Sequence, residues 1–190
     1  MTLRDLVSGF NCDLVCVEEP CFCWDDSVYK PAEDTWLAWE LVEELPYVGG
    51  LGVDVGCGSG ALLNVISKKV ERVVGVDLNP CAVKACKSCG FEALLCSSMS
   101  CLREADLVVA NLPYLPCSDD MSVCESYLPQ VLEGLKVKEN GYLILIYSSL
   151  TTIDPLRMLK GFRMVMERKV NMGMEELIGM VLRREPQNTL

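Results

Sequence analysis

The sequence contains no histidine, and its basic residues are outnumbered by acidic ones. Without an imidazole, a histidine general base, a Ser-His triad and a histidine-ligated metal are all excluded. The chain has 17 Lys and Arg residues against 27 Asp and Glu residues, which gives a formal net charge of −10 at pH 7. Such a surface repels phosphate backbones, so the composition disfavours duplex DNA or RNA as the primary partner and favours a basic protein substrate.

Long apolar runs are also missing. No run approaches the roughly 18 to 20 residues that span a bilayer, and the N-terminal residues lack the basic region, apolar core and cleavage site of a secretory signal. We therefore expect a cytoplasmic protein, in which the 12 cysteines stay reduced instead of forming a disulfide framework.

Some of the cysteines suggest a zinc site, because four thiolates can complete a tetrahedral ligand set. They stand at positions 12, 16, 21 and 23, and at positions 86 and 89. Their spacing is irregular, however, and cysteines on a helix or in a glycine-rich turn also suit tight packing as small apolar residues. We therefore expect unligated thiols and no bound metal.

At 190 residues, 51% of them hydrophobic, the chain has material for one core. Five short apolar runs rich in valine, leucine and isoleucine are typical of buried parallel strands. They occupy residues 51–55, 72–76, 91–95, 106–110 and 141–147. Helical patterns at 32–45, 61–69 and 80–88 precede the first three strands or lie between them, and Pro155 opens a short helix after the fifth strand.

The last part of the chain predicts a hairpin, with residues 163–170 and 177–183 on either side of a turn at Gly173. The alternation of strands and helices indicates an α/β fold with a doubly wound, mostly parallel sheet, and the antiparallel hairpin completes seven strands. We assign residues 29–185 to this domain and residues 186–190 to a tail. Residues 1–28 form an N-terminal extension that is either packed on the domain or partly disordered.

A glycine-rich segment at 53–61, Val-Asp-Val-Gly-Cys-Gly-Ser-Gly-Ala, joins the first strand to the next helix. Gly56 and Gly58 have no Cβ atom to block a close ligand, and a helix N-terminus offers free N–H groups to an anionic moiety. Asp77 ends the next strand, where its carboxylate can accept both hydroxyls of a ribose. These residues predict a nucleotide-like cofactor, but the pattern fits NAD, S-adenosylmethionine or a turn without a ligand.

A second motif decides between these cofactors. Asn111-Leu112-Pro113-Tyr114 follows the fourth strand and so reaches the same sheet edge as the glycine loop. It resembles the Asn-Pro-Pro-Tyr motif of methyltransferases that modify amide or exocyclic nitrogens, with Leu112 in place of the first proline. Residues 29–36, Tyr-Lys-Pro-Ala-Glu-Asp-Thr-Trp, are similar to the Pro-Ala-Glu-Asp-Thr segment of the eukaryotic and archaeal HemK-like release-factor glutamine methyltransferases. With the glycine loop, the resemblance covers about residues 28–183.

The resemblance implies a class I methyltransferase that uses S-adenosylmethionine to methylate the side-chain amide nitrogen of the Gly-Gly-Gln glutamine of a translation release factor. An amide nitrogen is a weak nucleophile, so the site must orient it and stabilise the positive charge that develops on it. The Asn111 side-chain oxygen and the Leu112 carbonyl can accept its two N–H groups. Tyr114 offers a flat face to the planar amide, and Pro113 fixes the loop.

The two motifs and the glycine loop also predict which residues bind the cofactor. The expected set is Tyr29, Thr35, Asp54, Gly56, Gly58, Asp77, Ser97 and Asn111. By the resemblance, Thr35 approaches the methionine end of the cofactor. Ser97 stands where the family usually has an Asp for the adenine amino group, and a hydroxyl accepts that bond more weakly than a carboxylate.

Eukaryotic members of the family act as heterodimers with a small zinc-binding activator protein, and the resemblance implies that partner here. Residues 1–28 leave no room for the separate substrate-binding domain of the bacterial relatives, and the apolar run 91–95 is a candidate for an exposed sheet edge. Three alternatives stay open. They are a methyltransferase for another nitrogen such as the exocyclic amine of adenine, a noncatalytic cofactor-binding subunit, and an NAD-dependent oxidoreductase.

Overall fold

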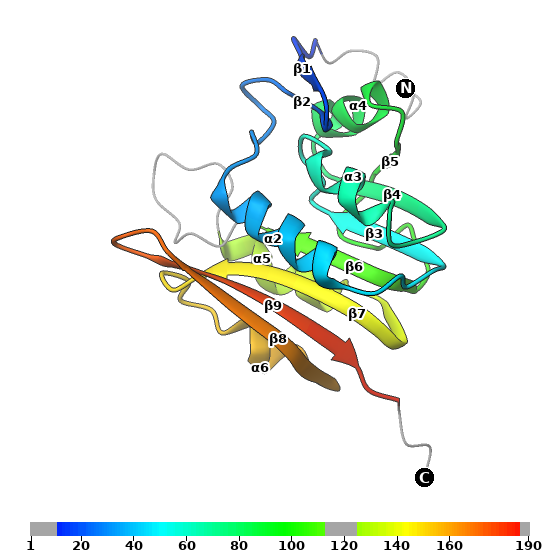
Figure 1. The fold of residues 1–190 in the computed structure, drawn as a ribbon. Coiled ribbons are helices and arrows are strands. Elements are labelled where there is room, and N and C mark those ends of the chain that lie inside the picture. Colours follow the sequence, from blue (N-terminus) through cyan, green and yellow to red (C-terminus); the bar gives the residue numbers. More distant parts are fainter. Residues whose placement is uncertain (1–10, 113–124, 187–190) are drawn as a thin grey trace.

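The computed structural model describes residues 11–112 and 125–186 of the chain. Within them lie a two-stranded hairpin near the N-terminus and a larger sheet with helices on both faces, as Figure 1 shows. The strands are β1 (Val15–Glu18), β2 (Cys21–Trp24), β3 (Leu51–Val55), β4 (Arg72–Asp77), β5 (Glu92–Leu95), β6 (Ala105–Asn111), β7 (Val137–Ser148), β8 (Phe162–Asn171) and β9 (Glu176–Arg184). The helices are α2 (Glu33–Glu44), α3 (Ala61–Ile66), α4 (Pro80–Ser88), a 3-10 turn η1 (Glu125–Tyr127), α5 (Leu128–Glu133) and α6 (Pro155–Met158). No helix of this described part is long and apolar enough to cross a membrane.

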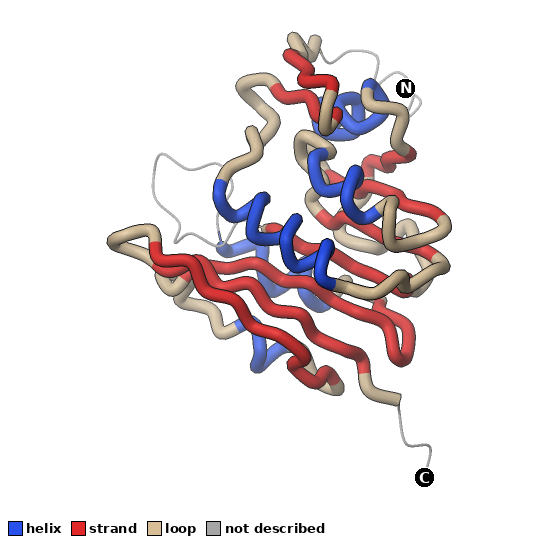
Figure 2. Tube along the Cα trace, in the orientation of Figure 1, coloured by secondary structure: helices blue, strands red, loops and turns tan. Residues whose placement is uncertain are grey.

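The larger sheet has seven strands in the order β5-β4-β3-β6-β7-β9-β8. Figure 2 shows its strands as red tubes beside the blue helices. The first five are parallel to one another, whereas β9 runs antiparallel to both of its neighbours, β7 and β8. The predicted fold class is therefore confirmed: a doubly wound, mostly parallel sheet of seven strands that ends in an antiparallel hairpin. The run at 91–95 forms β5, and β5 is an edge strand.

Two helical layers enclose the sheet because successive residues of its central strands point to opposite faces. Val109 of β6 belongs to the layer in which α2 and α3 bury Leu41 and Ile66. Its neighbour Val108 belongs to the opposite layer, which contains Leu128 of α5. Helix α3 lies very close to β3, since a Cβ atom at Gly52 would come within 2.7 Å of the Ile66 side chain. The sheet therefore has one core on each face.

The N-terminal hairpin of β1 and β2 was not predicted from the sequence. It lies beside α4 (Figure 1), where Cys12 and Val28 form a small buried cluster with Cys81 and Ala82 of that helix. The described part of the N-terminal extension, residues 11–28, is thus packed on the domain, which is one of the two possibilities that the sequence left open.

The expectation of free thiols is wrong for eight cysteines. The structure pairs them as the disulfides Cys12–Cys81, Cys16–Cys23, Cys21–Cys89 and Cys96–Cys101. Two of the four join the N-terminal segment to α4, because the fold brings together cysteines that are far apart in the sequence. Cys57 and Cys86 remain free and buried, with their sulfur atoms 3.3 Å apart.

Candidate functional site

The site lies at the carboxyl edge of the sheet, where β4, β3 and β6 end side by side. Val55 of β3 pairs with Val76 of β4 on one side and with Ala110 of β6 on the other. The next residues along these strands, Asp77 and Asn111, therefore flank the start of the glycine loop. Binding sites of open α/β sheets form at this edge, so the structure brings these predicted residues together as the sequence suggested.

The glycine loop makes a tight turn between β3 and α3. Gly56 and Gly58 have φ angles of +73° and +48°, which are left-handed values that favour glycine. The Gly56 N–H donates to the Val76 carbonyl at 2.8 Å, and the Gly58 N–H donates to Oδ2 of Asp77 at 2.9 Å. A Cβ atom at Gly56 would lie 3.2 Å from the Leu112 side chain. The loop is thus held against both neighbouring strand ends.

Asp77 is the link between the glycine loop and α4. Its second carboxylate oxygen, Oδ1, accepts a 2.8 Å bond from the N–H of Asn79, the N-cap residue of α4. Burial raises the pKa of Asp77, and the N–H bonds from Asn79 and Gly58 oppose that shift. Each carboxylate oxygen keeps further acceptor capacity, so Asp77 can still accept the hydroxyls of a ribose.

Asp54 of β3 is a buried carboxyl group in an unfavourable environment. Its side chain is only 2% exposed, and Oδ2 has no hydrogen-bond partner among the described residues. Burial, together with the negative charge of Asp77, raises the pKa of Asp54 to about 8. A positively charged ligand would relieve this cost, because it favours the ionised carboxylate.

Asn111 ends β6 with a second unsatisfied group. Its Oδ1 atom is buried and has no hydrogen-bond partner among the described residues. Leu112, which follows it, is buried. Pro113 and Tyr114, the other two residues of the predicted catalytic motif, lie outside the described residues. The structure therefore presents one buried acceptor from this motif, aligned with the glycine loop by strand pairing.

The upstream motif surrounds the start of α2. Asp34 and Thr35 are buried, and Oδ1 of Asp34 accepts the Tyr29 hydroxyl at 3.1 Å and the Thr35 N–H at 2.7 Å. Burial and the Asp34 carboxylate raise the pKa of Tyr29. The backbone oxygen of Tyr29 lies 3.9 Å from the position of a Cβ atom at Gly58. Residue 29 thus reaches the glycine loop, while the contact of Thr35 with the cofactor remains a prediction.

Ser97 follows β5 at the same carboxyl edge. The residue before it, Cys96, donates its N–H to the Asp77 carbonyl at 2.9 Å, which keeps this turn beside the end of β4. Ser97 is partly exposed. Its proposed contact with adenine remains a prediction.

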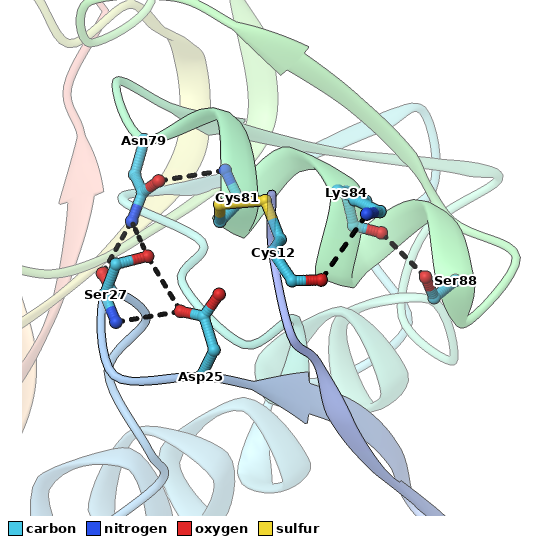
Figure 3. Close-up of a disulfide and its surroundings, with 7 residues drawn as sticks. All are labelled: Cys12, Asp25, Ser27, Asn79, Cys81, Lys84 and Ser88. Carbon is cyan, nitrogen blue, oxygen red and sulfur yellow. Dashed lines mark hydrogen bonds between the residues drawn. A yellow bond between two sulfur atoms is a disulfide. The ribbon is translucent and has the colours of Figure 1, made fainter. Parts of the chain in front are cut away.

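Contacts between the N-terminal segment and this edge were missed by the sequence analysis. The Cys23 N–H donates to the Ser59 carbonyl of the glycine loop at 3.0 Å. The Asn79 side-chain amide donates to the Ser27 carbonyl at 2.6 Å, as Figure 3 shows. The one available sequence signal was the matching abundance of cysteines in the N-terminal segment and around 81–89.

Comparisons with known proteins agree with this geometry. Residues 53–144 match the model of a methyltransferase domain. The chain is 31% identical over 182 residues to a protein of Methanocaldococcus jannaschii that carries the provisional name of a protein N5-glutamine methyltransferase, and the match covers 80% of this chain and 89% of that protein. This chain belongs to the class I methyltransferases.

Other matches cover a smaller part of the relative, or show similarity of the fold alone. The ribosomal protein L11 methyltransferase of Alteromonas mediterranea is 31% identical over 134 residues, which cover 64% of this chain and 46% of that enzyme. The crystal structure of ribosomal protein L11 methylase from Lactobacillus delbrueckii subsp. bulgaricus matches with a TM-score of 0.64 at 19% identity, over 84% of this chain and 82% of that one. The crystal structure of the N-methyltransferase NodS from Bradyrhizobium japonicum WM9, in complex with S-adenosyl-L-homocysteine, matches with a TM-score of 0.64 at 13% identity. The match covers 83% of this chain and 90% of that one.

S-adenosylmethionine is the cofactor of this methyltransferase. The residues of the site fit it on two counts. The left-handed glycines leave room for close approach of a ligand to the backbone. The unpaired Asp54 oxygen suits a ligand that carries positive charge, as this sulfonium compound does.

Proposed function

We propose that this methyltransferase transfers a methyl group to the side-chain amide nitrogen of the Gly-Gly-Gln glutamine of a translation release factor. The observation that carries the proposal is Oδ1 of Asn111, a buried acceptor without a partner among the described residues. Leaving such a group unpaired costs about 1–3 kcal/mol. An amide N–H of the substrate would satisfy it. The name of the Methanocaldococcus jannaschii relative points to the same reaction.

In this mechanism the chain binds and orients a weak nucleophile. Oδ1 of Asn111 and the backbone carbonyl of Leu112 accept the two N–H groups of the glutamine amide, which directs its nitrogen toward the methyl group. Both oxygens also stabilise the positive charge that develops on the nitrogen. Tyr114 stacks on the planar amide, and Pro113 restricts the loop. No histidine base is needed, because the excess proton can leave to water after transfer.

When bound, S-adenosylmethionine supplies an electrophilic methyl group. In the proposed arrangement Asp77 accepts the ribose hydroxyls, the glycine loop receives the carboxylate end, and Ser97 accepts from the adenine amino group. Thr35 and Tyr29 lie toward the methionine end. The buried carboxylate of Asp54 balances part of the positive charge of the cofactor.

We further propose a heterodimer with a small zinc-binding activator protein in the cytoplasm. The edge strand β5 supports a partner on that side, since its outer edge pairs with no other strand in the described part of the chain, and Leu94 on it is 41% exposed. The net charge of −10 suits a basic substrate protein.

The experiment is transfer of labelled methyl from S-adenosylmethionine to a purified release factor, with and without the activator. Mass spectrometry then locates the label. A release factor in which the Gly-Gly-Gln glutamine is replaced by alanine is the matched control. We expect one labelled glutamine in that segment, no label in the control protein, and faster transfer with the activator.

The competing substrates are ribosomal protein L11 and adenine-containing RNA or DNA, assayed under the same conditions. Label on one of these, with none on the release factor, would contradict the proposed substrate. Tight cofactor binding without transfer to any of them, with the activator present, would favour a noncatalytic subunit.

A further inference from the structure

The N-terminal segment is attached to α4 by two disulfides. Cys12–Cys81 joins the start of the described segment to the first turn of α4 (Figure 3), and Cys21–Cys89 joins β2 to the C-cap residue of the same helix. The two bonds differ in exposure. Cys12 and Cys81 are buried, with 8% and 5% of their surface exposed, whereas Cys21 and Cys89 are both partly exposed. A reductant in solution therefore reaches the second bond more easily than the first.

Residues at and next to the Cys21–Cys89 bond contact the glycine loop and the helix that follows it. The Cys21 carbonyl accepts a 2.7 Å hydrogen bond from the side-chain amide of Asn64 in α3. The Cys23 N–H donates to the Ser59 carbonyl of the glycine loop at 3.0 Å. The disulfide thus connects the C-terminal end of α4 to the glycine loop through a short stretch of β2.

The hairpin depends on this connection for its position. All four residues of β1 are exposed, and an isolated two-stranded hairpin is marginally stable in water. Without the Cys21–Cys89 bond, the hairpin would be held beside α4 by Cys12–Cys81 and by noncovalent contacts. Its conformational freedom would increase, and so would that of the glycine loop to which Cys23 is hydrogen-bonded. A ligand that binds the loop would then have to restore the lost order, at a cost in affinity.

We propose that the Cys21–Cys89 disulfide is a redox-sensitive switch that sets the affinity of this methyltransferase for S-adenosylmethionine. With the bond formed, β2 is fixed beside the glycine loop and the cofactor binds tightly. Reduction by a dithiol breaks the S–S bond and forms two S–H bonds. The dithiol supplies the two electrons and two protons and becomes a disulfide itself. The connection between β2 and α4 is then lost, and the affinity falls.

Thermodynamic linkage makes this effect reciprocal. If the disulfide strengthens cofactor binding by a given factor, the bound cofactor stabilises the disulfide against reduction by the same factor. Coupling between two sites of a protein is typically about 5- to 150-fold, and we expect about tenfold here. Redox sensing is also one of the usual roles of disulfides in the cytoplasm, where most structural thiols stay reduced.

The test is calorimetric titration of the full chain with S-adenosylhomocysteine, before and after reduction with dithiothreitol. Alkylation of free thiols, followed by mass spectrometry of the peptides, identifies which disulfides are open. We compare the wild type with Cys21→Ser/Cys89→Ser and with the control Cys16→Ser/Cys23→Ser, which lacks only the disulfide within the hairpin. The control also removes exchange between the two disulfides, since the Sγ atoms of Cys23 and Cys89 are 3.8 Å apart. Thermal unfolding confirms that each variant is folded.

We expect about tenfold weaker binding after reduction of the wild type and of the control variant, and recovery of the original Kd after reoxidation. Cys21→Ser/Cys89→Ser should bind about tenfold more weakly from the start and should not respond to dithiothreitol. In the wild type, saturating S-adenosylhomocysteine should raise by about tenfold the ratio of reduced to oxidised dithiothreitol that opens half of the Cys21–Cys89 bonds.

An unchanged Kd after complete reduction of Cys21–Cys89 in the wild type would overturn the proposal. A response to dithiothreitol that persists in Cys21→Ser/Cys89→Ser would overturn it in favour of another disulfide, such as Cys96–Cys101 around Ser97. The wild-type measurements need no substitution, so they decide the question even if a variant fails to fold. They also use no methyl acceptor, so their outcome does not depend on whether the proposed glutamine methylation is correct.

Discussion

Asp54 and Asn111 carry the two buried side-chain oxygens that lack a hydrogen-bond partner in the described part of the chain. Buried polar groups are nearly always paired, so two such oxygens on adjacent strands at one sheet edge indicate a ligand-binding role. They differ in charge. Asn111 offers a neutral acceptor suited to an amide N–H, and Asp54 offers a carboxyl group whose ionisation depends on what binds beside it.

Asn111→Ala should reduce methyl transfer by about 10²–10³-fold, because the positioned acceptor for the reacting amide is removed. Binding of S-adenosylhomocysteine, measured by calorimetry, should be largely retained, because Asn111 is only one of the eight residues predicted to bind the cofactor. The control is Asn171→Ala in the exposed β8–β9 turn, where Asn171 accepts the Gly173 N–H. Normal turnover by Asn111→Ala would contradict the proposed role.

Without a ligand, the Asp54→Asn variant should become increasingly more stable than the wild type as the pH rises. Burial and Asp77 raise the pKa of Asp54 to about 8, whereas the unfolded value is about 3.9. Between these values the folded state holds a proton that the unfolded state has lost, so the free energy of unfolding falls by about 1.4 kcal/mol per pH unit. Asparagine cannot ionise and removes this loss.

The measurement is the Tm of wild type and variant by calorimetry from about pH 3 to about pH 9, a range that brackets both pKa values. The Tm of the variant minus the Tm of the wild type should grow with pH and level off above about pH 8. A difference independent of pH would show that the Asp54 carboxyl is not buried in the way described. Asp106→Asn is the control. Lys138 and the Leu51 N–H lower the pKa of Asp106, so its contribution to the free energy of unfolding changes with pH in the opposite direction.

At the scale of elements, the site depends on close packing between β3 and α3. The glycine loop joins these two elements, so a shift of α3 would move the loop relative to Asp77 and Asn111. Gly52 makes the close approach possible, because a larger side chain there would collide with Ile66 and Val70. A residue outside the site thus controls the geometry within it.

Gly52→Val should destabilise the fold by about 1–3 kcal/mol through overpacking and weaken cofactor binding in the same variant. Thermal unfolding and calorimetric titration with S-adenosylhomocysteine measure the two effects. Gly90→Asn is the matched control, since no atom lies within 4 Å of a Cβ at Gly90, and asparagine tolerates its φ of +80°. Wild-type Tm and affinity in Gly52→Val would show that α3 is not held as described.

At the scale of the whole molecule, the fold is a sheet between two helical layers, with its ligand edge also contacted by the N-terminal segment (Figure 1). Cofactor binding therefore acts on parts of the chain that are distant in sequence. A ligand that binds only the folded state stabilises all of them together.

S-adenosylhomocysteine at about 100 times its Kd should raise the free energy of unfolding by about 2.7 kcal/mol, seen as a higher Tm. NAD at the same concentration should leave the Tm unchanged, because the chain is a methyltransferase. Differential scanning fluorimetry of the two mixtures checks this. Stabilisation by NAD alone would contradict the cofactor assignment.

The sequence by itself determined the succession of strands and helices along the chain, the glycine loop and the convergence of Asp77 with Asn111, because parallel strands place their carboxyl ends at one edge. Local patterns also located β3 and α4 at their observed limits. Only the tertiary structure decided which cysteines meet and that the N-terminal hairpin lies on α4. These contacts join residues more than 60 positions apart, and their partners are chosen by packing, which leaves no local pattern. The isolation of the Asp54 and Asn111 oxygens is likewise a property of the surrounding fold, since it depends on every group packed around them.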